Sequence, residues 1–245
     1  MPFFLFMKQY LKILCLSLSI TCGAQNASLA VEYQSIIDDV KDDYGLAEFT
    51  RARLLTNGSE SVYLERLPDT VYFSKSGLEV VQQKNSFTYP YHKNLTKRVV
   101  TYRDRNIDMD VIAHVNYRPV WTLTPVTKDI LGYKCQEAKG TYDCRNYTVY
   151  FAPDIPIPDG PYKFDGLPGL ILEVRSDDGS VVITATKIQP SAESITNPFA
   201  NVTKTVAVEE AAAKYRVKYE KMVNYFRTQD IDGGIPMRSI ECYVK

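Results

Sequence analysis

Short runs rich in Val, Ile, Thr and Tyr fill most of the 245-residue chain, and they constrain its fold more than any other feature. These residue types favour the pleated, half-buried surface of a β-sheet, and the chain contains 18 tyrosines. Turn signals such as Asn57-Gly58, Asp104-Arg105-Asn106 and Asp178-Gly179 separate many of the runs. The predicted strands cover residues 30–37, 47–55, 62–67, 71–74, 95–103, 108–114, 120–125, 132–142, 146–152, 169–175 and 180–187.

No segment of ordinary helical length interrupts these runs, which argues against parallel βαβ units and favours an antiparallel sheet. An amphipathic pattern then occupies residues 207–227, because apolar residues recur there at helical spacing. They are Val208, Ala212, Tyr215, Tyr219, Met222 and Phe226. We predict a mainly β (α+β) fold: one large curved antiparallel sheet or partly open barrel of about 9–11 strands, with this C-terminal amphipathic helix packed on it.

The N-terminus has the pattern of a secretory signal. Lys8 and Lys12 precede an apolar run at residues 13–20, and small residues stand at Cys22 and Ala24. We predict a signal peptide of residues 1–24, cleaved after Ala24, and export to the periplasm or outer envelope. The alternative is a lipoprotein acylated at Cys22. The apolar run is shorter than the roughly 20 residues that cross a bilayer, which argues against a membrane anchor. We expect residues 25–245 to form a single β-rich domain without a transmembrane span.

Three cysteines remain after the predicted cleavage: Cys135, Cys144 and Cys242. In an oxidising compartment this odd number predicts one disulfide and one free thiol. If Lys139-Gly140 is a hairpin loop, Cys135 stands opposite Cys144 and the two can be bridged. If Asp143-Cys144 is the loop, Cys135 with Cys242 is the better pair, because it ties the C-terminus to the sheet.

The segment GPYKFDGLPGLILEV, residues 160–174, combines glycines and prolines with an apolar strand. Tyr162 and Phe164 alternate with a lysine, and we expect both rings to enter the core. Pro168-Gly169 suits the centre of a type II turn, which requires a positive φ at the glycine. The segment is therefore predicted to be a double turn that anchors aromatic side chains before a core hairpin.

The run within this segment, GLPGLI at residues 166–171, resembles the signature of the GLPGLI family of envelope proteins from Gram-negative bacteria. The resemblance extends through residues 130–138 and 150–156 and to Trp121, and it departs at residues 143–145, where the family more often shows Gly before Arg. It implies a secreted or periplasmic β-rich protein of unassigned biochemical function. The motif residues, for which we predict a structural role, are Gly160, Pro161, Phe164, Gly166, Leu167, Pro168, Gly169, Leu170 and Ile171.

Candidate chemical sites are few. A calcium loop would use Asp104, Asn106, Asp108 and Asp110. That loop fails, because Met109 replaces the required glycine and Val115 the bidentate glutamate. The two histidines, His92 and His114, are too far apart for a zinc-binding H-E-x-x-H motif, and no nucleophile elbow, P-loop or dinucleotide fingerprint is present. We therefore expect no catalytic residues, no cofactor and no metal.

The charge pattern excludes one class of partner. The chain carries 29 basic and 29 acidic residues without a long run of either sign, which argues against nucleic acid. Strands and aromatic residues without a catalytic constellation favour a non-enzymatic envelope protein that binds an apolar ligand, a peptide or an outer-membrane partner. Two alternatives stay open: a periplasmic hydrolase assembled only in the fold, with His92 or His114 as its base, and a structural subunit of an envelope assembly.

Overall fold

The computed structural model describes residues 28–38, 47–66, 71–73, 79–81, 88–106, 109–116, 119–143 and 145–228. The predicted signal peptide of residues 1–24 and the alternative acylation site Cys22 lie outside these residues, so both stay predictions. Over the described part of the chain, no helix combines the length and the apolar character of a membrane span.

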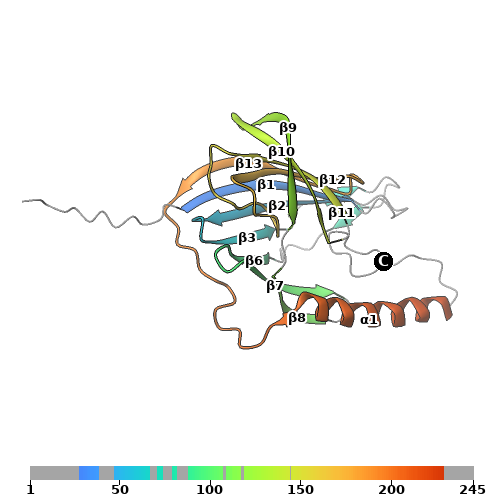
Figure 1. Cartoon of the computed structure of the whole chain (residues 1–245). Coiled ribbons are helices and arrows are strands. Elements are labelled where there is room, and N and C mark those ends of the chain that lie inside the picture. Colours follow the sequence, from blue (N-terminus) through green and yellow to red (C-terminus); the bar gives the residue numbers. More distant parts are fainter. Residues whose placement is uncertain are drawn as a thin grey trace, which may run out of the picture.

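One large curved sheet contains twelve strands, and two short strands pair separately (Figure 1). The large sheet consists of β1 (Ser28–Asp38), β2 (Ala47–Thr56), β3 (Glu60–Arg66), β6 (Thr88–Asn94), β7 (Val99–Asn106), β8 (Met109–Val115), β9 (Val120–Ile130), β10 (Tyr133–Tyr142), β11 (Arg145–Ala152), β12 (Leu170–Ser176), β13 (Val181–Ser191) and β14 (Val206–Ala207). The separate pair consists of β4 (Val71–Phe73) and β5 (Glu79–Val81). The strand order is β14-β8-β7-β6-β3-β2-β1-β13-β12-β11-β10-β9, and neighbours are antiparallel except for the parallel pair β14 and β8.

The predicted fold class is confirmed. The described strands form one curved, mainly antiparallel sheet that ends at β14 and β9, so the sheet is open rather than closed into a barrel. The sequence reading missed β6 because Pro90 interrupts its strand pattern, and prolines are tolerated only at special sheet positions. The predicted strand 95–103 starts only at Val99, because residues 95–98 form a turn in which Arg98 has a φ of 58°.

The predicted helix is also confirmed, within one residue at each end. Helix α1 (Val208–Thr228) follows β14 directly and lies beside β8 (Figure 1). Val208, Ala211 and Tyr215 are buried, and Glu209 and Glu210 occupy the first turn, where the helix dipole favours negative charge. β14 and α1 thus cover one end of the sheet with residues of this same chain.

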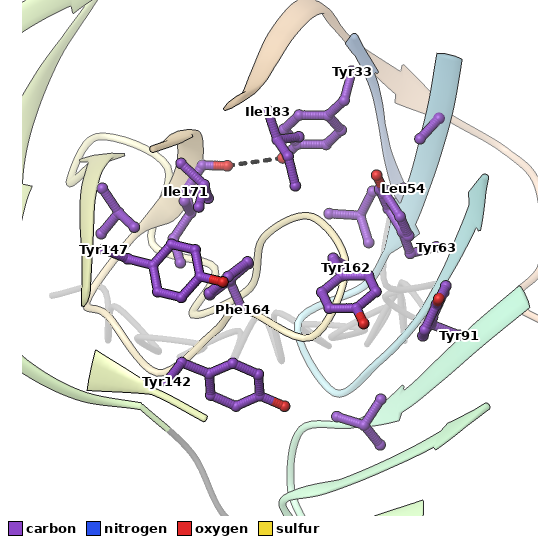
Figure 2. Packing of buried hydrophobic residues seen from close by; sticks show 14 of the residues in the cluster. Tyr33, Leu54, Tyr63, Tyr91, Tyr142, Tyr147, Tyr162, Phe164, Ile171 and Ile183 are labelled. Carbon is purple, nitrogen blue, oxygen red and sulfur yellow. Dashed lines mark hydrogen bonds between the residues drawn. The ribbon is translucent and has the colours of Figure 1, made fainter. Parts of the chain in front are cut away.

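The core lies inside the curve of the sheet. The segment between β11 and β12 places Tyr162 and Phe164 there, as the sequence predicts (Figure 2). The Tyr162 ring centroid is 4.8 Å from that of Tyr91 on β6, and the Phe164 ring is 4.9 Å from that of Tyr147 on β11. Because β6 and β11 are far apart in the strand order, contact with both means that the sheet curves around this segment, which we call the inner loop (residues 153–169).

Tyrosines from the walls of the sheet complete this aromatic core. Tyr33 on β1 donates a hydrogen bond of 2.8 Å to the Ile171 carbonyl, which ties the base of the curve to the start of β12 (Figure 2). Trp121 packs over Gly140, where an added Cβ would lie 2.7 Å from the indole, and donates a hydrogen bond of 2.8 Å to the Asp165 carbonyl. Strands from both halves of the sheet therefore hold the inner loop in place.

Candidate functional site

A buried lysine fixes the inner loop to the sheet. Lys93 of β6 has a fully buried side chain and pairs with Asp159, which is also fully buried. The Lys93 Nζ donates to the Gly160 carbonyl at 2.5 Å and to the Phe164 carbonyl at 3.5 Å. An ammonium group has three donors, and these three acceptors use them all. The Lys93–Asp159 pair is therefore a structural clamp and is closed to a substrate.

The predicted type II turn at Pro168-Gly169 is wrong. The positive φ belongs to Gly166, at 88°, and Gly169 is not among the residues with positive φ. Gly169 is required for a different reason: an added Cβ would lie 2.3 Å from the Ala152 carbonyl oxygen at the end of β11. The close approach of two backbones, rather than turn geometry, selects glycine here.

The motif residues lie mostly in the core. Gly160, Pro161, Phe164, Leu167, Gly169, Leu170 and Ile171 are buried, whereas Gly166 and Pro168 are exposed. Gly160 lies close to Ile171 of β12 and Gly169 lies close to the end of β11, and the structural role of the motif stays a prediction. Within the motif, only Gly166 and Pro168 are therefore accessible to a ligand.

The structure does not bring the two histidines together. The strand register pairs Thr101 with His92 on one side and with His114 on the other, so the histidines stand two strands apart, about 10 Å. His92 is buried, and this burial lowers its pKa against the opposing effect of Glu60, whose Oε2 lies 3.8 Å from Nε2. A hydrolase that uses one histidine as a base would therefore lack the other as a partner.

The acidic run tested as a calcium loop belongs to a hairpin. Asp104 pairs with Val111 and Arg105 with Asp110 across β7 and β8. Arg103 donates two hydrogen bonds of 2.6 Å to the Asp110 carboxylate. Asp108 lies outside the described residues. The acidic residues therefore belong to paired strands and not to a calcium loop.

The β10–β11 register bears on the hairpin loop beside the cysteines. Tyr142 pairs with Arg145, and Lys139 and Gly140 lie within β10, so the alternative with a hairpin loop at Lys139-Gly140 does not form. Cys144 itself lies outside the described residues, so a bridge between it and Cys135 stays a prediction. Cys242 lies outside the described residues, so its pairing with Cys135 stays a prediction.

The Cys135 thiol is buried and free in the structure, and burial raises its pKa to about 11. Because the thiolate is the reactive form, we expect iodoacetamide to leave Cys135 unmodified in the folded chain at pH 8 and to alkylate it after unfolding. Peptide mapping by mass spectrometry measures both states. Alkylation that requires unfolding together with a reductant would show instead that Cys135 is in a disulfide.

A row of polar side chains crosses three neighbouring strands on the outer face of the sheet. The register places Glu137 of β10 opposite Tyr150 of β11, and Tyr150 opposite Glu173 of β12. The Tyr150 hydroxyl donates a hydrogen bond of 2.9 Å to the Glu137 carboxylate. We call Glu137, Tyr150 and Glu173 the outer row. Alternate residues of these strands, such as Val149 and Val174, are buried in the core, so the row faces away from it.

Cations from β9 and β12 surround the outer row. Lys128 Nζ donates to both oxygens of Glu173, at 2.9 and 2.7 Å, and lies 5.3 Å from the centre of the Tyr150 ring. Arg175 Nε donates to Glu173 at 2.6 Å, and Thr124 donates to Glu137 at 3.0 Å. The carboxylates are almost fully buried, whereas the Lys128 and Arg175 side chains are 42% and 50% exposed. Buried acceptors therefore hold exposed donors in fixed positions beside a half-buried tyrosine.

The charge state of Glu173 limits what the outer row does chemically. Its burial acts to raise the pKa of this carboxyl, but hydrogen bonds from Lys128 and Arg175 outweigh that effect and hold the pKa below its ordinary value. A general acid needs a proton at working pH, and Glu173 does not carry one. The arrangement suits contact with polar groups of a ligand better than proton transfer.

The outer row was missed in the sequence, although a signal exists. Glu173 stands alone in the apolar strand Leu170–Ser176, and Glu137 lies within the strand Tyr133–Tyr142. A lone carboxylate in a strand that is otherwise buried requires a partner, because an unpaired buried charge is costly. Arg175 lies two residues along the same strand, whereas Lys128 is 45 positions away and only the fold brings it to Glu173.

The region that contains the outer row and the whole inner loop matches a known protein family. The family model described as "N-glycanase peptide, N-terminal domain" matches residues 78–214, more than half of the chain. The chain belongs to this N-glycanase N-terminal domain family. The match includes every strand from β6 to β14 and the first residues of α1.

Solved structures agree with the family at the level of the fold. A structure of PNGF-II in space group C2 matches with a TM-score of 0.51 and 17% identity, and it covers 78% of this chain and 32% of the solved chain. A second structure of PNGF-II, in space group P21, gives a TM-score of 0.48, 15% identity and coverages of 74% and 31%. The chain thus spans about a third of the length of the solved chains. No curated protein matches the sequence significantly.

The family overturns the predicted resemblance. The GLPGLI assignment rested on short stretches around residues 166–171, whereas the N-glycanase N-terminal domain model matches a continuous 78–214. The predicted function, a non-enzymatic envelope protein for an apolar ligand, peptide or outer-membrane partner, rested on strands and aromatic residues without a catalytic constellation, and the same family match shows that it is wrong. The hexapeptide is a packing element of the inner loop, which explains why it did not identify the family.

Proposed function

We propose that this chain takes part in the processing of N-linked glycans as a domain of an N-glycanase-type protein, and that the outer row contacts the carbohydrate. The observation that carries the proposal is the family match over residues 78–214. The outer row lies entirely within the matched residues. The fold that the chain shares with PNGF-II supports the same class of function.

The chemistry of the outer row suits a sugar. A carbohydrate offers hydroxyl groups that donate and accept hydrogen bonds, and an apolar C–H face that packs on an aromatic ring. Tyr150 is half-buried and supplies the ring, and Lys128 and Arg175 supply exposed donors. Since Glu173 already holds both cations, little side-chain freedom is lost when a ligand binds.

The outer row holds a substrate and does not cleave it. Glu137 and Glu173 are two strands apart, so their Cα atoms are separated by about 10 Å. Glu173 is held ionised by two cations, and the Tyr150 hydroxyl donates a hydrogen bond to Glu137. Bond cleavage therefore falls to residues outside the outer row.

We expect a free N-linked oligosaccharide to bind the purified chain, and Tyr150→Ala to weaken that binding roughly tenfold or more, because the ring is the central contact. Isothermal titration calorimetry measures both dissociation constants. Tyr219→Ala on α1 is the matched control, because Tyr219 is also a partly buried tyrosine but is remote from the outer row in sequence and fold.

Two results would contradict the proposal. One is that the wild-type chain binds no N-linked oligosaccharide at millimolar concentration. The other is that Tyr219→Ala weakens binding as much as Tyr150→Ala does, since the loss would then be general. Circular dichroism on each variant confirms that the sheet is intact.

A further inference from the structure

Strand β9 is an open edge with an unusual concentration of exposed apolar side chains. It stands last in the strand order, so one side of its backbone has no neighbouring strand among the described residues. Val120, Leu123 and Val126 are 83%, 49% and 47% exposed. Leu131, in the turn that follows, is 45% exposed. The other large exposed hydrophobic residues of the described chain, Val217 and Tyr225, lie on α1.

The two edges of the sheet differ in whether other parts of the chain cover them. At one end β8 is covered by β14 and α1, which belong to the chain itself. At the other end β9 presents backbone N–H and C=O groups together with apolar side chains. Exposed edges of this kind pair readily with another extended chain. Natural proteins either protect such edges from pairing or use them to bind a partner.

Only part of β9 is protected. The register with β10 shifts between the pairs Gln136–Thr127 and Ala138–Leu123, so residues 124–126 form a bulge that contains Pro125. Lys128 and Asp129 follow, and charges on an edge discourage pairing. Residues 120–123 pair regularly with β10 and carry no charge. The open, regular part of the edge is thus Val120–Leu123.

This edge adjoins the outer row. Thr124 and Lys128 of β9 donate hydrogen bonds to Glu137 and Glu173. β10 lies between β9 and the ring of Tyr150 on β11, so the edge and the ring are two strands apart, about 10 Å. That distance suits a ligand with one part on the edge and another part on the row.

We propose that the polypeptide part of a glycosylated substrate adds to β9 along Val120–Leu123 as an extended strand, with its glycan on the outer row. This inference rests on the proposed function and names the second half of the substrate. Strand addition relies on main-chain hydrogen bonds, so it accepts many sequences, and contacts with Val120 and Leu123 add apolar area. A protein that acts on glycans carried by many polypeptides needs this tolerance.

A second copy of the chain is the rival occupant. Two β9 edges pairing over four residues bury far less than the roughly 1,200 Å² or more of a stable interface. A short peptide needs less, because the glycan adds contacts on the outer row. The geometry therefore favours a glycosylated peptide on this edge.

The test uses backbone N-methylation of an extended N-glycopeptide. In an added strand, alternate N–H groups point toward β9 and the others point to solvent. Two peptides of the same sequence are N-methylated at odd or at even positions. We expect one of them to bind the full chain roughly tenfold or more weakly and the other to bind like the parent peptide. Fluorescence anisotropy measures the dissociation constants.

Two protein variants complete the test. Leu123→Lys is expected to weaken glycopeptide binding roughly tenfold while leaving binding of the free oligosaccharide unchanged. Val217→Lys is the matched control, because Val217 is 53% exposed on α1 and is expected to have no effect. Circular dichroism confirms folding, and sedimentation velocity measures the oligomeric state of each variant.

The outcomes separate this inference from the proposed function. Strand addition is overturned if both methylated peptides bind equally well and Leu123→Lys does not change glycopeptide binding. If the free oligosaccharide still binds in that case, the proposed function stands. A dimer that Leu123→Lys dissociates assigns the edge to a second copy and also overturns it. If neither the oligosaccharide nor the glycopeptide binds, the proposed function itself fails.

Discussion

Replacing Lys93 by methionine is expected to lower the free energy of unfolding by about 3–5 kcal/mol, because it leaves the buried Asp159 carboxylate without its counter-charge. The Gly160 and Phe164 carbonyl oxygens lose the same donor. Methionine keeps the length and flexibility of the side chain, so the charge is the main change. Urea unfolding followed by circular dichroism measures the difference.

The matched control is Lys187→Met. Lys187 pairs with Glu32 at 4.0 Å, and both side chains are at least half exposed, so this loss is expected to cost less than about 1 kcal/mol. The double variant Lys93→Met/Asp159→Asn should regain part of the stability, because it removes the unpaired charge. Equal costs for Lys93→Met and Lys187→Met would show that the clamp does not hold the inner loop.

Replacing Gly169 by alanine should destabilise the chain by about 2–3 kcal/mol, because the new Cβ meets backbone that has little room to move. It would lie 2.3 Å from the Ala152 carbonyl oxygen, 2.8 Å from the Ala152 carbonyl carbon and 3.0 Å from the Phe151 ring. Relief requires a shift between the inner loop and the end of β11. The midpoint of thermal unfolding is a sufficient measurement.

Gly166→Ala separates packing from backbone conformation. Gly166 has a φ of 88°, but nothing lies within 4 Å of an added Cβ, so the expected cost is about 1 kcal/mol of conformational strain. We therefore expect the Gly169→Ala variant to be clearly less stable than the Gly166→Ala variant. The reverse order would mean that turn conformation, and not close packing, selects the glycines of the motif.

Local sequence patterns were sufficient for the fold class. The alternation in Tyr147, Val149 and Phe151 places these side chains on one buried face of β11, and the helical spacing of Val208 and Tyr215 places both in the core. Each pattern reports which face of an element is apolar, and burial of that face is the main driving force of the fold. Strand order, curvature and the open ends do not follow from such patterns, because they depend on which faces meet.

Contacts between distant residues could not be predicted. Lys93 looks like a surface residue in the sequence TYPYHKN of β6, and only the fold places it against Asp159, 66 positions later. The hexapeptide at residues 166–171 misled in the opposite direction, because it looks distinctive in the sequence but serves only local packing. Its glycines allow a tight loop and its leucines fill the core. Many unrelated proteins pack a loop in this way, so the hexapeptide does not identify a family.

The candidate site was the least predictable part. Glu137, Tyr150 and Glu173 are separated by 13 and 23 positions, and they become a row only through the registers of β10, β11 and β12. The exposure of Val120 and Leu123 likewise follows from the position of β9 at the end of the sheet. A pattern search along the chain treats these residues as ordinary strand positions.

The most direct test of glycan contact at the outer row is an NMR titration of the ¹⁵N-labelled chain with a free N-linked oligosaccharide. We predict that the largest shifts in backbone amide signals occur around Lys128, Tyr150 and Glu173, and that signals of α1 stay unchanged. Shifts confined to α1, or no shifts at millimolar oligosaccharide, would contradict the account.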